Sequence, residues 1–357
     1  MTIPSDLIAF AVALVGSLCL TVPVRRFALQ YGMVDHPGPR KVHLRPVPLL
    51  GGIAIYLGFV LAILLTLHAV PQQQMTSILA GATLLAVVGG MDDGRLLHHQ
   101  VKLFVGMPAA ALFLLASGIR ADIFARFIPG FGGLVLDGCL TMFWVVGITA
   151  SFSILDHMDG LCAGISAVGA IFFFLSASFS GQTMVRTLAA ATLGAALGFL
   201  LWNFNPAKIF MGDGGAMFLG FLMAALGLKV RPEGIHGSVS WLVPVLILGV
   251  PIFDTTLVSI SRARRSLLPF TSPGKDHTAH RLSNLGLGHR GAVLALYAVA
   301  VLFGIIALAI PHVSVGTAYM IAAVAALCGI VAVIFLERAP YERQVKPRKS
   351  VPSLQLQ

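Results

Sequence analysis

The chain of 357 residues is 57% hydrophobic and only 11% charged, and its mean hydropathy is +0.90. Soluble domains of this length are far less apolar, so the composition excludes a soluble globular protein and predicts an integral membrane protein. The formal net charge of +10 lies in loops between apolar runs, which indicates membrane topology rather than binding of nucleic acid.

The apolar runs predict an all-α polytopic membrane helical bundle of about 10–11 transmembrane helices, because each crossing needs about 20 apolar residues. We expect one integral membrane domain, residues 1–336, followed by a basic and disordered tail, residues 337–357. Glycines in residues 119–137 predict a short external hairpin. The candidate spans are 7–24, 49–68, 75–91, 102–118, 138–155, 161–180, 184–202, 214–228, 239–261, 291–310 and 313–336.

Lysine and arginine are concentrated in alternate loops and in the tail. By the positive-inside rule these loops are cytoplasmic, which places the N-terminus outside and the C-terminus in the cytoplasm. The first cytoplasmic loop carries Arg40, Lys41 and His43. Two interpretations stay open for this cluster: it anchors the topology, or it binds an anionic substrate at the membrane surface.

An acidic pair, Asp92 and Asp93, closes the span 75–91 with no opposite charge before Arg95. Charge near hydrocarbon is costly and tends to mark function, so we interpret the pair as the site of a divalent cation. The alternative is a pair that only solubilises the helix end. Lys102 opens the next span on the same side.

Three further acids return to that membrane face. Asp156 and Asp159 are three residues apart, which places both on one side of a helical turn; a helix cap is the alternative. Asp213 lies between glycines that allow backbone N–H groups to approach an anion. Asp254, inside the span 239–261, is either part of a substrate site or a structural hydrogen-bond acceptor.

The last cytoplasmic loop contains His277, His280 and Arg281. We interpret these residues as an anion-binding cluster, because two histidines with one nearby acid make a poor zinc motif. Carboxylates that bind Mg²⁺ beside basic groups that bind phosphate indicate phosphoryl transfer. No GxxxxGK[ST] motif is present, and a site at the border of water and hydrocarbon favours a lipid substrate.

These motifs occur in one order and on one side: Asp92-Asp93, Asp156-His157-Met158-Asp159-Gly160, Phe210-Met211-Gly212-Asp213 and His277 to Leu282. In this the chain resembles the polyprenyl-phosphate N-acetylhexosamine-1-phosphate transferases, from Arg40 to Arg290. The resemblance implies transfer of a sugar-1-phosphate from a UDP-sugar to undecaprenyl phosphate, with release of UMP and a need for Mg²⁺, or Mn²⁺ in its place. It also implies a bacterial inner-membrane protein with a cytoplasmic active site that starts peptidoglycan, teichoic acid or O-antigen synthesis.

The resemblance assigns roles residue by residue. It implies catalytic roles for Asp92, Asp93, Asp156, His277 and His280. It implies metal ligation by Asp213, Asp92, Asp93 and Asp156. It implies substrate contacts from Lys102, Asp159, Asn203, Phe210, Arg281, Arg40, Lys41 and His43.

The chain departs from the family pattern where Ala150 and Ser153 replace asparagines, where His157 replaces a glycine and where Ala279 replaces a histidine. The spaced histidines resemble the N-acetylglucosamine branch, so we expect UDP-N-acetylglucosamine as the donor. A phospho-N-acetylmuramoyl-pentapeptide transferase and a non-enzymatic lipid transporter are the alternatives. The sequence leaves open the glycan pathway, the lipid chain length, direct against double displacement, and whether the chain forms a homodimer.

Overall fold

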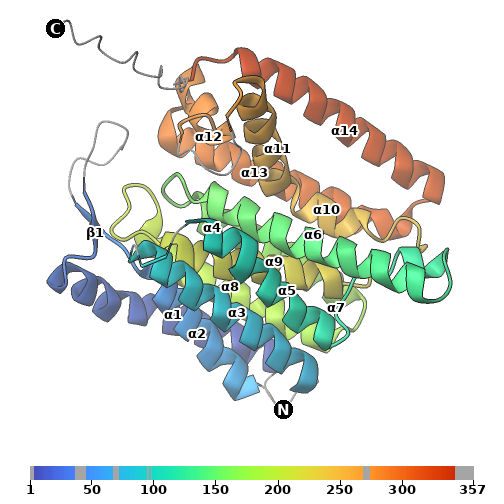
Figure 1. Ribbon diagram of the computed structural model, residues 1–357, viewed down its shortest axis with the longest axis horizontal. Coiled ribbons are helices and arrows are strands. Elements are labelled where there is room, and N and C mark those ends of the chain that lie inside the picture. The colour runs from blue at the N-terminus through green and yellow to red at the C-terminus, as the bar shows by residue number, and fades with distance from the viewer. Residues whose placement is uncertain are drawn as a thin grey trace, which may run out of the picture.

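A computed structural model describes residues 4–36, 46–66, 72–94, 96–97, 99–267 and 274–341, and nearly all of them are helical (Figure 1). Apolar runs become helices because a helix satisfies its own backbone hydrogen bonds where no water is available. The first half contains α1 (Ser5–Gln30), α2 (Gly51–Thr66), α3 (Gln72–Asp93), α4 (His99–Val101), the π-helix η2 (Lys102–Gly106), α5 (Met107–Ala116), η3 (Phe124–Arg126) and α6 (Phe131–Leu155).

The second half contains α7 (Leu161–Phe179), α8 (Thr183–Asn203), α9 (Gly212–Lys229), α10 (Leu242–Ile247), α11 (Gly249–Arg264), α12 (Thr278–Leu282), the π-helix η4 (Ser283–Leu287), α13 (Gly288–Ala309), η5 (Ile310–His312) and α14 (Val315–Arg338). Two short strands, β1 (Val34–Asp35) and β2 (Val47–Pro48), pair antiparallel with Val34 opposite Pro48. They are the only strands in the described ranges.

Within the described ranges, seven helices are long and apolar enough to cross a membrane. Two shorter apolar helices, Gly51–Thr66 and Lys102–Ala116, coincide with two further predicted spans. The prediction of an all-α, multi-pass membrane protein is therefore confirmed.

Two details of the predicted architecture are wrong. The external hairpin does not form, because residues 124–126 make a 3-10 turn and α6 already begins at Phe131. The span 239–261 is not one helix, because it breaks at Leu248 into α10 and α11. At the other end of the chain, α14 continues through Glu337 and Arg338, two residues into the segment predicted as tail.

Helix α9 is the centre of the bundle, because every residue from Gly214 to Leu228 is buried. Glycines let its first turn approach two neighbouring helices closely. A Cβ atom on Gly89 of α3 would lie 2.5 Å from the Cα atom of Gly214, and one on Gly52 would collide with the backbone of Gly215. These contacts bring the start of α9 directly against the acidic end of α3.

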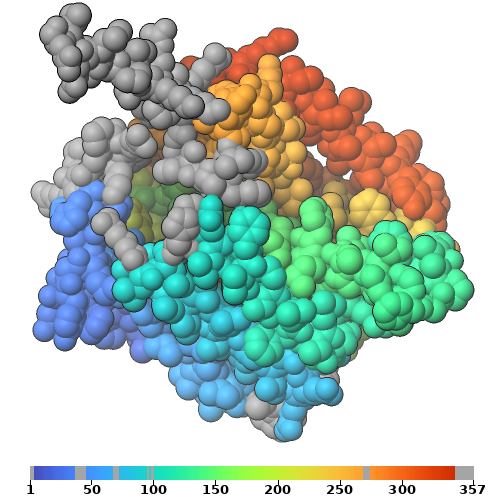
Figure 2. All heavy atoms as spheres, viewed as in Figure 1, coloured from blue at the N-terminus to red at the C-terminus, as the bar shows by residue number. Residues whose placement is uncertain are grey.

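Helix α14 lies at the edge of the molecule, away from the bundle around α9 (Figure 1). It is the outermost coloured element along the upper right side in the space-filling view (Figure 2). Only 6% of its most apolar window is buried, against 72% for α7 and α8. Its exposed apolar side chains are therefore available to lipid.

Candidate active site

The acidic end of α3 caps the first turn of α9. Asp93 Oδ1 accepts a hydrogen bond from the backbone N–H of Asp213 at 2.8 Å, and Oδ2 accepts one from Gly214 at 3.1 Å. A carboxylate is favourable there because the first N–H groups of a helix have no partner within the helix. Asp93 thus fixes the position of Asp213.

Lys102 connects the two acidic motifs. Its Nζ atom donates to Asp92 Oδ2 at 2.8 Å and to Asp213 Oδ2 at 2.6 Å, and all three side chains are partly buried. Lys102 begins η2, and a π-helical turn of this kind is frequent at functional sites. Asp92 and Asp213, which come from separate sequence motifs, therefore converge on one cationic group.

Ser153 completes the surroundings of Asp213. Its hydroxyl donates to Asp213 Oδ1 at 2.6 Å, so both oxygens of this carboxylate have partners. Ser153 is one of the departures from the family pattern. In the sequence, only its position in the motif that contains Asp156 indicated that it could lie in the site. The structure shows that the serine still supplies a hydrogen-bond donor.

Asp156 follows the end of α6 beside this cluster, and no hydrogen bond links its side chain to another described residue. Burial raises the pKa of Asp156 well above its usual value, and the nearby carboxylates of Asp213, Asp93 and Asp159 raise the pKa further. A cation bound nearby would lower the pKa again, because opposite charge favours the ionised carboxyl group.

Asp159 and Asn203 join two loops of the site. Asp159 Oδ2 accepts hydrogen bonds from Asn205 Nδ2 at 2.9 Å and from the backbone N–H of Ala207 at 3.0 Å. Asn203 is 2% exposed; its oxygen accepts from Gly160 N and its amide nitrogen donates to Ile209 O, both at 3.0 Å. Asp159 and Asn203 thus fix the loop of residues 204–209, which leads to Asp213. Their predicted contacts with the substrate stay predictions.

Three histidines gather beside the carboxylates. The rings of His157 and His277 stack at 4.0 Å with an interplanar angle of 22°, and His280 lies 4.8 Å from His157. Because His157 follows Asp156 directly, the histidine cluster and the acidic cluster meet at these two residues. Burial lowers the pKa of His157 well below its usual value, and the neighbouring His277 lowers this pKa further, so His157 is neutral at pH 7.

Asp254 orients His277. Its Oδ2 atom lies 3.0 Å from His277 Nδ1, and its Oδ1 atom accepts from the backbone N–H of Thr278 at 2.7 Å. Because a carboxylate oxygen can only accept, this contact makes Nδ1 the protonated, donating nitrogen of the ring. The role of Asp254 was open from the sequence, and the geometry favours positioning of His277.

The histidine cluster is not arranged to bind a metal ion. Among the described residues, ligand atoms of His157, Asp254 and His277 lie within 4.8 Å of one another. However, the two rings are nearly parallel, so their in-plane lone pairs do not converge on one point. His277 Nδ1 is also already bonded to Asp254. The carboxylates around Lys102 offer the more suitable cation site.

Arg281 has a structural role, where the sequence indicated anion binding. It is fully buried, and it donates to the backbone oxygens of Asp276 and Leu336 and to Ser261 Oγ, at 2.8 to 2.9 Å. Its guanidinium group also lies 3.9 Å from the centre of the Tyr341 ring. These bonds attach the end of α14 to α11 and α12 and leave Arg281 no exposed surface for a phosphate.

Asp276 supports the same region through two arginines. It accepts from Arg262 at 2.9 and 3.0 Å and from Arg265 at 2.5 Å. Burial alone would raise the pKa of Asp276, but these hydrogen bonds outweigh burial and lower the pKa to about 2. The ion pairs fix the loop that leads into His277.

The remaining predicted site residues are placed as follows. Phe210 is half-buried, and its backbone N–H donates to Pro48 O at 2.8 Å, beside β2. Arg40, Lys41 and His43 lie outside the described residues. The structure thus brings together Asp92, Asp93, Lys102, Asp156 and Asp213 and, next to them, His157, His277 and His280.

The fold and the site define a multi-pass membrane protein with a polar, carboxylate-rich centre where several helices end. The chain matches the family described as Glycosyl transferase family 4 over residues 75–231. It is 37% identical over 317 residues to a probable undecaprenyl-phosphate N-acetylglucosaminyl 1-phosphate transferase of Bacillus subtilis, covering 86% of each chain.

Two other relatives agree. The chain is 32% identical to a decaprenyl-phosphate N-acetylglucosaminephosphotransferase of Mycolicibacterium smegmatis, over 77% of this chain and 74% of the relative. It is 30% identical to an undecaprenyl-phosphate alpha-N-acetylglucosaminyl 1-phosphate transferase of Salmonella typhi, over 79% and 77% of the two chains.

The chain belongs to glycosyl transferase family 4, in its group of polyprenyl-phosphate sugar-1-phosphate transferases. It is therefore an enzyme, a glycosyl-1-phosphate transferase, and the alternative of a non-enzymatic transporter falls away.

Proposed function

We propose that this enzyme transfers N-acetylglucosamine-1-phosphate from its UDP-sugar to undecaprenyl phosphate and releases UMP. The observation that carries the proposal is the convergence of Asp92 and Asp213 on Lys102, which gathers opposite charges where a diphosphate and a cation would meet. The names of three relatives support both the sugar and the polyprenyl phosphate acceptor.

Mg²⁺ is the proposed cofactor, with Mn²⁺ as a substitute. The residues fit such an ion, because carboxylate oxygens of Asp92 and Asp213 already converge on one cationic group, and Mg²⁺ favours one or two carboxylates together with substrate phosphates. Asp213 and Asp92 would hold the ion, with Asp156 alongside. When bound, the ion would offset negative charge on the diphosphate. Asp93 uses both oxygens on α9, so its contribution is to position Asp213.

The proposed reaction is a single in-line displacement. An oxygen of the lipid phosphate attacks the phosphorus that bears the sugar, and the bond from that phosphorus to the bridging oxygen breaks, so that UMP leaves with this oxygen. Lys102 offsets charge on the diphosphate, and Asp92 accepts the proton of a monoprotonated lipid phosphate. Formation of a phosphoaspartate during turnover would contradict this route in favour of covalent catalysis.

We also propose that the site faces the cytoplasm of a bacterial inner membrane and that the product starts a cell-envelope glycan. The positive-inside pattern supports this orientation, because the basic loops and the site lie at the same helix ends. UDP-sugars are soluble and the acceptor is a lipid, so the reaction needs a site at this boundary.

The decisive experiment is a donor assay with the purified full chain in detergent. Undecaprenyl phosphate and Mg²⁺ are combined with UDP-N-acetylglucosamine or with UDP-N-acetylmuramoyl-pentapeptide, and UMP and the lipid product are measured. We expect UMP and a lipid-linked diphosphate sugar only with the first donor. Turnover only with the second donor would instead identify a phospho-N-acetylmuramoyl-pentapeptide transferase. Asp213→Asn should be inactive, and Asp122→Asn, in the exposed Asp122–Arg126 pair, is the matched control.

A further inference from the structure

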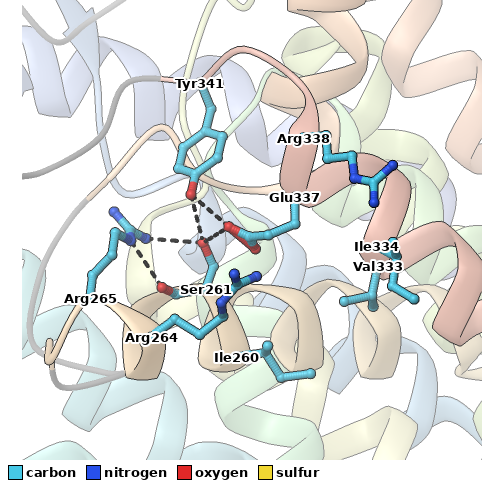
Figure 3. Close-up of a pocket in the computed structure, with 9 residues that line it drawn as sticks. All are labelled: Ile260, Ser261, Arg264, Arg265, Val333, Ile334, Glu337, Arg338 and Tyr341. Atoms are coloured by element: carbon cyan, nitrogen blue, oxygen red, sulfur yellow. Dashed lines mark hydrogen bonds between the residues drawn. The ribbon is translucent and has the colours of Figure 1, made fainter.

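A pocket of about 780 Å³ opens between α11 and the outer helix α14, apart from the carboxylate site (Figure 3). One side carries charged and polar groups and the other is aliphatic. Its lining residues are Ile260, Ser261, Arg264, Arg265, Val333, Ile334, Glu337, Arg338 and Tyr341. None of the carboxylates that surround Lys102 takes part.

The polar side of the pocket has an excess of positive charge. Three arginines face a single acid, Glu337, whose Oε1 atom accepts from Tyr341 at 2.7 Å and from Ser261 at 3.0 Å, while Oε2 lies 3.5 Å from Arg281. The hydrogen bonds of Glu337 therefore come from Tyr341 and Ser261, and the nearby positive charge of Arg264 also acts on its carboxylate.

Unlike Glu337, Arg264 and Arg338 make no hydrogen bonds within the described ranges. Both are exposed, and no hydrogen bond or ion pair links either one to another residue of the described ranges. No dashed bond reaches either guanidinium group in Figure 3. In addition, Nη1 of Arg265 is buried without a hydrogen-bond partner among the described residues. The pocket thus presents two exposed arginines, Arg264 and Arg338, whose donors are not used in the described ranges, a pattern suited to an anion with several oxygens.

The apolar side of the pocket suits a hydrocarbon chain. Ile260 is 41% exposed on α11, and Ile334 is 52% exposed on α14, which is long and apolar enough to cross a membrane. Arg264 and Arg338 lie in the last turns of α11 and α14, and the end of a membrane-crossing helix such as α14 reaches the headgroup region. A ligand that carries phosphate oxygens at one end and an aliphatic chain at the other matches a pocket with arginines at the helix ends and isoleucines beside them.

We propose that this pocket binds an anionic glycerophospholipid of the surrounding bilayer, with its phosphate on Arg264 and Arg338 and one acyl chain along Ile260 and Ile334. Arginine is well suited to this role because its planar fork of donors matches phosphate oxygens. The occupant is not the polyprenyl phosphate acceptor, because the acceptor's phosphate must reach the carboxylates, and none of them lines the pocket.

Occupancy has a structural consequence. The phosphate would join the ends of α11 and α14, which in the described residues are held together by Arg281 and Glu337. It would also lie next to Arg265, which bonds Asp276 immediately before His277. An anionic lipid therefore stabilises the region that holds the histidines, without entering the reaction.

The test uses the full chain in detergent with added phosphatidylglycerol or phosphatidylcholine, followed by native mass spectrometry and thermal unfolding. We expect phosphatidylglycerol to bind and to raise the unfolding temperature more than phosphatidylcholine. R264Q/R338Q should weaken phosphatidylglycerol binding about tenfold or more, since it removes both positive charges that hold the phosphate. Arg126→Gln, in the exposed pair with Asp122, should change neither property.

A second variant tests the apolar wall. Ile334→Trp fills the pocket and keeps both arginines, and it should weaken phosphatidylglycerol binding while the fold stays intact in phosphatidylcholine. Equal binding of the two lipids would overturn the proposal. So would unchanged phosphatidylglycerol binding by both variants, or displacement of the bound lipid by stoichiometric undecaprenyl phosphate.

Discussion

Lys102 Nζ lies 2.6 Å from Asp213 Oδ2, although the two residues are 111 positions apart in the chain. The same ammonium group contacts Asp92 at 2.8 Å, so it holds two carboxylates together that would otherwise repel each other. In the proposed mechanism, Lys102 and a divalent cation share the neutralisation of these acids and of the substrate diphosphate.

Replacing Lys102 with Met should therefore lower kcat by about 100-fold or more, the range seen when one charge-stabilising donor is removed from an active site. Lys102→Arg should restore part of the activity, because it keeps the charge and shifts its position. Steady-state assays of UMP release at saturating Mg²⁺ measure both effects. Unchanged kcat in the Met variant would exclude Lys102 from the reaction.

The contact of Gly89 with Gly214 offers a clean test of how the site is assembled. A Cβ atom on Gly89 would lie 2.5 Å from backbone atoms of α9, whereas one on the adjacent Gly90 meets nothing within 4 Å. Gly89→Ala should separate α3 from α9, lower the unfolding temperature and reduce activity, while Gly90→Ala should leave both properties close to wild type. Similar behaviour of the two variants would argue against the close helix contact.

Asp254 should act through His277. Asp254→Ala removes the acceptor for His277 Nδ1 and for the Thr278 N–H, so the imidazole loses its fixed orientation. We expect a fall in kcat with a change in the pH profile of kcat, and partial rescue by Asp254→Asn, which keeps one acceptor oxygen. A loss of stability with an unchanged pH profile would show that Asp254 only supports the fold.

Asp276 should contribute stability that depends on pH. Its pKa in the fold is about 2, below the value of about 4 expected in an unfolded chain, so the folded form holds the ionised carboxylate more tightly. This contribution is complete above about pH 4 and is lost as the pH falls toward 2. Asp276→Asn leaves Arg262 buried without its ion pair to this residue and should cost about 3–5 kcal/mol at pH 7. Chemical unfolding of both proteins at pH 7 and pH 3 measures the difference, which should shrink at the lower pH.

The sequence predicted the helices and the acidic motifs well, because hydrophobic length and charge position are local properties. The runs 7–24 and 161–180 became α1 and α7, and Asp92, Asp156 and Asp213 came together. It did not predict which groups already have partners. Charge alone cannot tell a phosphate-binding arginine from Arg281, whose donors are used inside the protein, since that depends on packing across 55 residues.

Other features also depended on tertiary contact. The glycine-rich residues 119–137 suggested a hairpin, but Asp137 accepts from the backbone N–H groups of residues 123–125 and so stabilises a 3-10 turn instead. His157 looked like a departure from a pattern, and only the structure shows it stacked on His277. Asp254 could not be assigned from the sequence because its partners lie 23 and 24 residues away.

The proposed mechanism requires that Asp92 and Asp213 together hold one divalent cation, and binding of Mn²⁺ followed by electron paramagnetic resonance addresses this requirement without relying on turnover. The wild-type chain in detergent, with UMP present, should bind Mn²⁺, and Mg²⁺ should displace it. Asp213→Asn and Asp92→Asn should each weaken this binding strongly, while Asp122→Asn should not. Unchanged Mn²⁺ affinity in both site variants would show that the cation is held elsewhere.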